Sequence, residues 1–330
     1  MKKLLMLFLF ILFLCSFTGC DFAGGTTSSR ELILYSTLEP KFTDELVAAY
    51  NAKNKKNKSF APVKVIYELS EKSPTPNLVL GPRVMLIGLK QEGKLQQCAS
   101  DSAALLPQEF KDVDGYWQGV FYDPLVFVIN QQFARRVGQK NLQSWNDLEN
   151  LVDVRFTMEN LNNTLGTMNL LAAMACHMGE QSAITYMWNA NRFMTSYTKF
   201  PFSSIRLVAT GEADMTVTVQ SMVSKYLENE FPAYVVLPKE GSPANMYGVA
   251  VYKETKQLKA SRLFMEWLLA EDYVKVISQK QDTGFVFLVQ EGLLNPKADP
   301  SLVWLNKDYL TVEKLEALTN QWVEKVRFSK

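Results

Sequence analysis

Short apolar runs alternate with amphipathic segments along most of the chain. The first run, 31–37, ends in hydroxyl side chains and is typical of a strand, and Pro40 then begins a segment with apolar residues at helical spacing. Strands that alternate with helices predict βαβ units and a mostly parallel sheet. We expect strands at 31–37, 62–69, 78–80, 119–130, 215–219, 234–237 and 247–252. One helix is expected to begin at Pro40, and a second to follow Gly81-Pro82 and end at Lys90. Further helices are expected at 145–151, 165–178, 180–189, 204–209, 259–269 and 312–326.

A proline interrupts the longest of the strand-like runs, 119–130. Proline is poorly tolerated in a central strand because it donates no hydrogen bond to a neighbour. We therefore expect this run to cross between two parts of the fold rather than to form the core of a sheet. A solvated loop is expected at 51–59 and a turn at 239–243.

The first twenty residues have the pattern of an export signal. Lys2 and Lys3 precede eleven apolar residues, which suit a signal peptide better than a membrane span, and Thr18 and Gly19 stand before Cys20 as in a bacterial lipobox. This predicts a lipoprotein signal peptide at 1–19, lipid on Cys20, and a flexible polar tether at 20–29. The alternative is a plain signal peptide cleaved nearby.

Composition narrows the class of protein. The chain is 47% hydrophobic, 12% aromatic and 21% charged, with a net charge of +1, which excludes a disordered or collagen-like chain and argues against nucleic acid as a partner.

The single histidine, His177, excludes a multi-histidine metal site. His177 neighbours Cys176, but adjacent helical residues point about 100° apart, so a helix-surface histidine is favoured over a catalytic pair. Cys98 and Cys176 are expected to be free thiols. We expect no catalytic residues, no cofactor and no metal site.

Five segments together resemble the type II periplasmic solute-binding proteins of ABC transporters, in the branch that takes ferric iron, phosphonates and phosphorylated sugars. They are 34–37, 116–125, 207–214, 237–251 and 264–269. The resemblance implies an α/β, two-lobed fold in which two crossing strands join the lobes and the solute lies in the cleft between them. The implied lobes are 30–125 plus 245–290 and 126–244, with hinge segments at 122–130 and 245–252 and C-terminal helices at 291–330 packed on the lobes.

The implied function is capture of a small solute by a monomeric lipoprotein and delivery to an ABC permease. A receptor that signals to a membrane sensor kinase is an open alternative. The lipid would hold the protein on the periplasmic face of the inner membrane, or on the outer face of the cell membrane in a host with one membrane. An exported hydrolase is disfavoured because no G-x-S-x-G motif or metal-ligand spacing occurs, and a purely structural lipoprotein would leave the cleft loops unused.

Candidate binding residues lie mostly in loops that follow strands, where open α/β sheets hold their ligands. The full set is Ser36, Thr37, Gly81, Arg83, Tyr122, Thr164, Gly166, Thr167, Tyr197, Lys199, Ser203, Ser204, Gln220, Ser221 and Tyr247.

Several of these residues have a second interpretation. Arg83 either contacts an anion or is an exposed arginine with a nearby carboxylate. Thr164 and Thr167 either cradle an anion or cap the helix that follows. The aromatic pair Phe200 and Phe202 either walls the pocket or packs beneath it.

Hydroxyls, cations and helix starts suit a small anionic organic or phosphorylated solute. The iron-binding relatives resemble one another in two adjacent tyrosines, and no Tyr-Tyr pair occurs in this chain. Ferric iron held through a synergistic anion, or through Tyr197, Tyr226 or Tyr247, is the alternative.

Overall fold

Twelve described strands form one mixed sheet, with helices on both of its faces. The structure is a computed structural model that describes residues 31–56, 60–137, 142–227, 232–270, 273, 284–288 and 299–328. The elements from Leu32 onward belong to one unit, Leu32–Lys330. The predicted signal peptide, Cys20 and the tether lie outside the described residues.

Three parallel strands form one end of the sheet, in the order β2 (Val63–Ile66), β1 (Leu32–Ser36) and β3 (Leu78–Pro82). The helix α2 (Pro40–Asn54) follows β1, and α3 (Arg83–Gln91) follows β3. The predicted alternation of strands and helices is therefore confirmed here.

Three further parallel strands form the other end, in the order β7 (Met194–Thr198), β6 (Phe156–Glu159) and β8 (Met215–Val219). Each is followed by a helix that begins near its carboxyl end. These helices are α9 (Pro201–Ala209) after β7, α7 (Leu165–Met178) after β6 and α10 (Gln220–Leu227) after β8.

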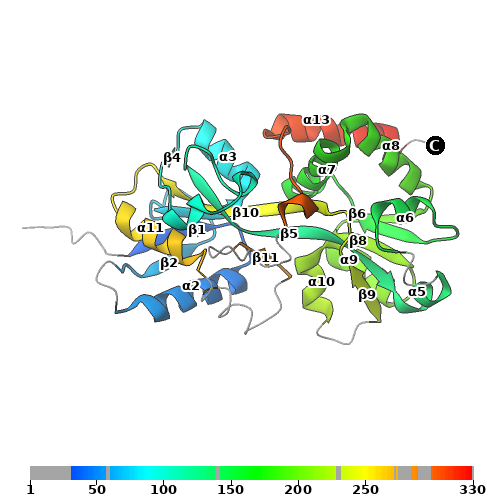
Figure 1. Cartoon of the computed structure of the whole chain (residues 1–330), viewed down its shortest axis with the longest axis horizontal. Helices are drawn as coiled ribbons and strands as arrows, with labels where there is room; N and C mark the ends of the chain where they lie inside the picture. The colour runs from blue at the N-terminus through cyan, green and yellow to red at the C-terminus, as the bar shows by residue number, and fades with distance from the viewer. Residues whose placement is uncertain are drawn as a thin grey trace, which may run out of the picture. The chain divides into compact units, whose positions relative to one another are not determined.

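Two long antiparallel strands, β5 (Trp117–Asn130) and β10 (Ser242–Tyr252), connect the two ends (Figure 1). The first half of β5 pairs with β10, and from Leu125 onward β5 pairs with β8. On its other edge β10 pairs with β3. The sequence prediction that 119–130 crosses between two parts of the fold is confirmed.

The expectation that this crossing segment avoids the sheet core is wrong, because all fourteen residues of β5 are buried. Pro124 is tolerated because it lies where β5 changes neighbours. It is the last residue of β5 to pair with β10, opposite Ala244, and the next residue, Leu125, pairs with Val219 of β8.

The other predicted elements also form, with shifted ends. The helix α2 continues to Asn54, into the expected loop, and β10 begins at Ser242, inside the expected turn. Among the longer elements, the sequence analysis missed β6, β7, α10 and α5 (Gln131–Val137). It also missed the short elements β4 (Leu95–Gln96), α4 (Asp101–Ala104), η1 (Gln108–Phe110), β11 (Val286–Phe287), η3 (Pro300–Leu302) and β12 (Val303–Trp304). The remaining elements, which were predicted, are α6 (Trp145–Glu149), α8 (Glu180–Asn191), β9 (Ala233–Val236), α11 (Leu258–Trp267), α13 (Val312–Trp322) and η4 (Val323–Arg327).

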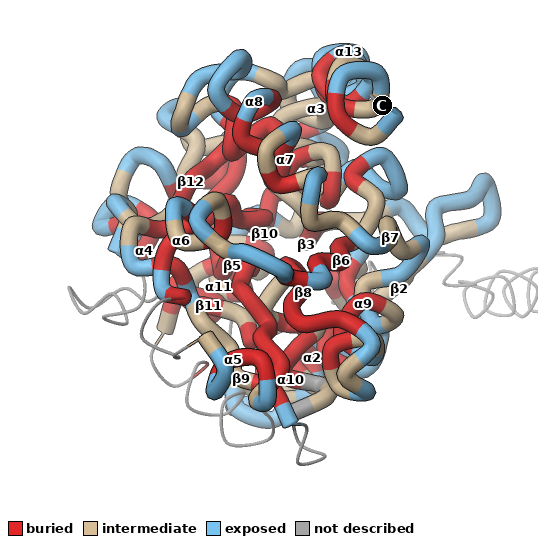
Figure 2. Tube along the Cα trace, turned by 90° about the vertical axis from the view of Figure 1, so that its right-hand side faces the viewer, coloured by how far each residue is buried: buried red, intermediate tan, exposed pale blue. Residues whose placement is uncertain are grey.

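Burial is concentrated on the sheet, where β5 and β8 are buried along almost their whole length, whereas the helices keep exposed outer faces (Figure 2). The last helix, α13, contacts α7 and α8. Its Leu315, Leu318 and Trp322 belong to the same apolar cluster as the cores of those two helices. The C-terminal segment therefore helps to bury the end of the sheet that carries β6 to β8.

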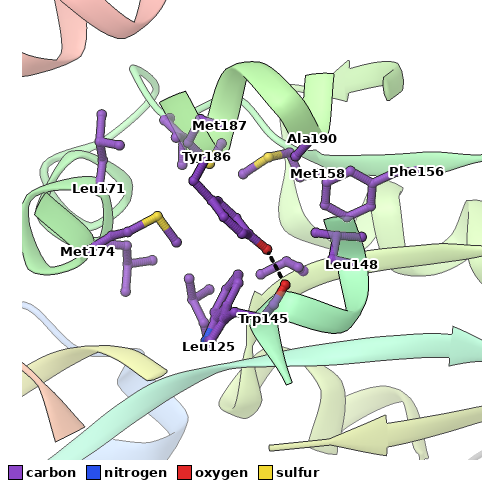
Figure 3. Close-up of a pocket in the computed structure, with 13 residues that line it drawn as sticks. Leu125, Trp145, Leu148, Phe156, Met158, Leu171, Met174, Tyr186, Met187 and Ala190 are labelled. Atoms are coloured by element: carbon purple, nitrogen blue, oxygen red, sulfur yellow. Dashed lines mark hydrogen bonds between the residues drawn. The ribbon is translucent and has the colours of Figure 1, made fainter. Parts of the chain in front are cut away.

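Inside this cluster lies a space that we call the apolar core space, between α6, α7, α8 and the sheet (Figure 3). Leu171 and Met174 reach it from α7, and Met187 from α8. The only hydroxyl among its lining residues is that of Tyr186, which donates a hydrogen bond to the main-chain oxygen of Trp145 at 2.8 Å. The polar atom is thus satisfied within the protein, and the remaining lining is hydrocarbon, sulfur and the Trp145 indole.

Candidate functional site

A second space, which we call the cleft pocket, lies beside the crossing strand β10, between the helices that follow strands of the two ends of the sheet. It has about 500 Å³ of atom-free space, including its open mouth. The start of α3, the start of α7, β10 and the segment after β12 all contribute to it. The lining residues are Pro82, Arg83, Val84, Met85, Leu165, Gly166, Asn169, Asn245, Met246, Tyr247, Leu305 and Asn306.

Two helix N-termini line the cleft pocket because the parallel strands of both ends have their carboxyl ends there. The helix α3 begins directly after β3, and its N-cap is Pro82, whose side chain has no hydrogen-bonding atom. The first N–H groups of a helix have no carbonyl partner within the helix, and they carry the positive end of its dipole. Backbone donors and positive potential at this position favour an anion.

Arg83 adds a formal charge to the same place. One guanidinium nitrogen, Nη1, donates to the main-chain oxygen of Asn306 at 2.5 Å, and the guanidinium carbon lies 5.6 Å from the centre of the Trp117 ring. Its Nε is buried and bonds to no acceptor among the described residues. Burial lowers the pKa of Arg83 from its ordinary value, and nearby Cys176 and Asp112 oppose that shift. An arginine remains charged even so. Of its two interpretations, an exposed surface arginine is wrong for this side chain.

Three asparagines that the sequence analysis did not single out also line the cleft pocket. Asn169 of α7 donates through Nδ2 to Oδ1 of Asn245 on β10 at 2.8 Å, and Asn306 donates through Nδ2 to Oδ1 of Asn169 at 3.1 Å. All three are at most 9% exposed. For Asn169 and Asn245 the available signal in the sequence was a lone amide in a mostly apolar helix or strand, since such a residue is buried only when it is hydrogen-bonded.

Residues 73–312 match the family of bacterial extracellular solute-binding proteins. The chain is a bacterial extracellular solute-binding protein. This confirms the resemblance found in the sequence.

Similar proteins agree with this family. An uncharacterized protein of Haemophilus influenzae is 25% identical over 65% of the chain, a match that spans 64% of that relative's own length, just under two thirds. Iron uptake protein A1 of Synechocystis is 22% identical over 87% of the chain and 83% of its own length. The structure of the periplasmic binding protein AfuA from Actinobacillus pleuropneumoniae, with fructose-6-phosphate bound, has a TM-score of 0.66 at 17% identity, over 91% of this chain and 99% of AfuA. The solute-binding protein has the same two-lobed fold.

Three of the predicted binding residues line the cleft pocket of this solute-binding protein: Arg83, Gly166 and Tyr247. The ring of Tyr247 stacks on Phe121 with 5.3 Å between the ring centres. Burial, and to a smaller extent the charge of Asp123, raise the pKa of the Tyr247 hydroxyl. Tyr247 therefore offers a neutral hydroxyl at ordinary pH.

Ser36, Thr37 and Gly81 lie together at the carboxyl ends of β1 and β3. The Ser36 hydroxyl is 3.1 Å from the Thr43 hydroxyl and accepts the Leu38 N–H at 3.2 Å, so it is occupied within the turn into α2. A Cβ on Gly81 would lie 3.0 Å from the Thr37 hydroxyl oxygen. The Thr37 side chain and the Met85 sulfur, 3.2 Å from the same position, leave little room for a side chain at residue 81.

Thr164 and Thr167 form a capping box at the start of α7. The Thr164 hydroxyl accepts the Thr167 N–H at 3.1 Å, and the Thr167 hydroxyl accepts the Thr164 N–H at 3.1 Å. The capping interpretation is therefore confirmed. Binding of an anion by these two threonines stays a prediction.

Gln220 and Ser221 begin α10 and meet two other parts of the chain. Ser221 donates its N–H and its hydroxyl to the Asp123 carboxylate, at 3.0 and 2.6 Å. Gly284, at φ +69°, touches the same turn, because a side chain there would lie 2.6 Å from the Ser221 Cα. The predicted Ser221 hydroxyl is thus already hydrogen-bonded.

Five further predicted residues also lie outside the cleft pocket, as do Ser36, Thr37, Gly81, Thr164, Thr167, Gln220 and Ser221. Tyr122 stacks on Phe110, and the Tyr197 hydroxyl donates to Asn191 at 2.7 Å. The Ser204 hydroxyl donates to the Pro201 oxygen at 2.8 Å, and the Ser203 N–H donates to the Phe200 oxygen at 3.0 Å. The Lys199 ammonium lies 5.4 Å from the centre of the Phe200 ring.

Phe200 and Phe202 stack on each other at the start of α9, with 5.5 Å between ring centres, and remain 48% and 44% exposed. Packing beneath the pocket, one of their two interpretations, is wrong because half of each ring faces solvent. Neither residue lines the cleft pocket.

The thiols and the histidine agree with their sequence interpretation. Cys98 and Cys176 are free, and His177 is exposed on α7, where its ring stacks on Trp304 at 3.9 Å between ring centres. Within the described ranges, no group of three or more His, Cys, Asp or Glu residues is placed to hold a metal ion. Of the helices that the structure describes, none is long and apolar enough to cross a membrane.

Proposed function

We propose that this protein captures a small anionic solute, an organic or phosphorylated molecule, in the cleft pocket and delivers it to an ABC permease in the membrane. In this proposal Cys20 carries a lipid that holds the protein at the membrane surface, the protein acts as a monomer, and the lobes close on the solute around β5 and β10. A membrane sensor kinase is the alternative partner.

The observation that carries the proposal is the half-buried Arg83 guanidinium at the start of α3. Its Nε has no hydrogen-bond acceptor among the described residues, although it is buried, and leaving a buried donor unpaired is unfavourable. An anionic oxygen in the cleft pocket would accept from this nitrogen and from the free N–H groups of the same helix end.

The strength of such contacts fits a binding protein. A hydrogen bond to a charged group contributes about 1.5–3 kcal/mol. Loss of one such bond therefore weakens binding roughly tenfold to a hundredfold.

Ferric iron is the second candidate, and the iron uptake protein among the relatives favours it. The tyrosines that the sequence offers for iron do not come together. Tyr197, Tyr226 and Tyr247 pack against three different apolar clusters. For this reason we propose the anion and not the metal ion.

The test is a titration of the purified soluble domain with a panel of solutes, followed by calorimetry and by thermal unfolding. The panel contains inorganic phosphate, fructose 6-phosphate, methylphosphonate, citrate and ferric citrate. We expect at least one anion to bind and to raise the unfolding temperature, since a ligand that binds only the folded state stabilises it. Binding of ferric citrate alone would contradict the proposal.

Arg83→Gln tests the residue, and Arg206→Gln is its matched control because Arg206 is exposed in the last turn of α9. We expect Arg83→Gln to weaken anion binding roughly tenfold to a hundredfold and Arg206→Gln to leave it unchanged. Equal anion affinities of the two variants would show that Arg83 does not bind the solute.

A further inference from the structure

We infer that Asn245 presents its side-chain N–H group to the bound solute, and that Asn169 and Asn306 are positioning residues that fix this orientation. The inference rests on the proposed function only in requiring a solute with an acceptor oxygen in the cleft pocket. It adds a specificity-determining donor on β10, beside Gly166 at the start of α7.

The orientation begins at the main chain of Tyr309. The Tyr309 N–H donates to Asn306 Oδ1 at 2.9 Å, and the Tyr309 carbonyl accepts from Asn306 Nδ2 at 2.7 Å. An amide side chain can be turned by 180° without changing its shape, so its orientation follows from its partners. Backbone groups cannot exchange the roles of donor and acceptor. Asn306 is therefore fixed with Nδ2 toward Tyr309 O and Asn169.

The fixed orientation passes along the three side chains. Nδ2 of Asn306 uses its second hydrogen on Oδ1 of Asn169, at 3.1 Å, which leaves Nδ2 of Asn169 to donate to Oδ1 of Asn245, at 2.8 Å. Each amide oxygen thus accepts a hydrogen bond, and the amide nitrogens of Asn306 and Asn169 each donate one to the next side chain. Turning any one of them would set two oxygens or two NH2 groups against each other in a buried place, which is costly.

The last amide in the series has its nitrogen at the cleft pocket. Oδ1 of Asn245 is occupied by Asn169, so Nδ2 lies on the other side, 3.4 Å from the position of a Cβ on Gly166. Gly166 and Asn245 both line the pocket. A solute oxygen there meets a donor, and a solute group that itself donates is rejected.

Asn306 also holds Arg83, through its main-chain oxygen. One residue therefore helps to place two donors of the pocket, the guanidinium through its backbone and the Asn245 amide through its side chain. Both favour a solute with several acceptor oxygens, such as a phosphate or carboxylate.

Asn306→Asp tests the inference because it keeps the shape of the side chain and reverses the series. At pH 8 the carboxylate accepts the Tyr309 N–H but has no hydrogen for Asn169. Asn169 must then turn its NH2 group toward residue 306, and Asn245 must turn its own toward Asn169, which leaves an oxygen at the pocket. We expect the affinity for the anion that binds the wild type to fall at least roughly tenfold, and Asn245→Asp to lower it similarly.

Asn320→Asp is the matched control, since Asn320 is exposed on α13 and the change adds the same charge. If Asn306→Asp binds the anion as tightly as the wild type, while Arg83→Gln still weakens binding, the inference is overturned and the proposed function stands. A wild type that binds no anion of the panel overturns both.

A measurement on the wild type covers the case in which Asn306→Asp does not fold. In side-chain amide NMR spectra, fructose 6-phosphate, or whichever panel anion binds, should shift the Asn245 NH2 signals strongly. The Asn306 NH2 signals should shift little, because both hydrogens already have partners. Shifts of similar size, or none at Asn245, would contradict the inference.

Discussion

One helix, α7, lines two spaces of opposite character. Leu170, Leu171 and Met174 face the apolar core space, where the single hydroxyl, that of Tyr186, is bonded to the main chain. The other side of the helix start brings Gly166 and Asn169 to the cleft pocket, beside Arg83 of α3. The apolar core space offers no unpaired donor or charge to a solute, whereas the cleft pocket offers both.

The comparison teaches that stability and binding are separable in this protein. The apolar core space is lined by side chains whose contribution is burial of hydrocarbon, and any gap there costs packing energy. The cleft pocket combines apolar side chains with a few donors that hydrogen bonds hold in place, and we expect these donors to determine which solute fits. Substitutions on the two sides of α7 should therefore affect different measurements.

The largest expected effect on stability is that of Leu171→Ala. Leu171 is 2% exposed and lines the apolar core space, so its removal enlarges a space that already exists. We expect the free energy of unfolding to fall by about 2–5 kcal/mol, measured by urea denaturation, with anion affinity unchanged. Leu105→Ala is the matched control, because Leu105 is 65% exposed and lines neither space. If Leu171→Ala instead lost anion affinity at an unchanged free energy of unfolding, stability and binding would not be separable in this way.

A smaller effect is expected for Tyr186→Phe, which removes the one hydroxyl of the apolar core space. The Trp145 carbonyl, within a residue that is 5% exposed, then loses its donor. We expect a loss of about 1–3 kcal/mol in the free energy of unfolding, because a buried acceptor is left unpaired. The ring itself stays in place. Unchanged stability would mean that water or another donor reaches the Trp145 oxygen.

The smallest effect is expected for Thr164→Ala, at the end of α7 nearest the cleft pocket. It removes the side chain that caps Thr167, and we expect about 0.5–2 kcal/mol less stability. Anion affinity should change less than twofold if the threonine serves the helix alone. A tenfold loss of affinity at this position would instead assign Thr164 to the solute, the other interpretation of its sequence.

Much of the fold was predictable because its strands and helices have strong apolar patterns. The helix at α7 and the strands β1 and β8 follow directly from such runs. The strands β6 and β7 were missed because neither FTME nor MTSYT forms an apolar run, and β7 is half-buried with no regular alternation. Pro124 misled the burial prediction because a sequence does not show where a strand changes its neighbours.

The candidate site was predictable only in part. Arg83 and Gly166 could be found because they stand at the starts of predicted helices. Asn306 could not, since its contacts with Asn169 and Arg83 join residues that are 137 and 223 positions apart. Ser36 and Ser221 have the right chemistry, but the turn into α2 already uses the Ser36 hydroxyl and Asp123 of β5 accepts from the Ser221 hydroxyl. Only the folded chain reveals that competition.

The most direct test of the central claim is a crystal structure of the protein with the panel anion that raises its unfolding temperature most. The proposed function predicts anionic oxygens in the cleft pocket, within hydrogen-bond distance of the Arg83 guanidinium and of the first N–H groups of α3. An anion bound elsewhere, or an iron ion held by protein oxygens in the cleft, would contradict it.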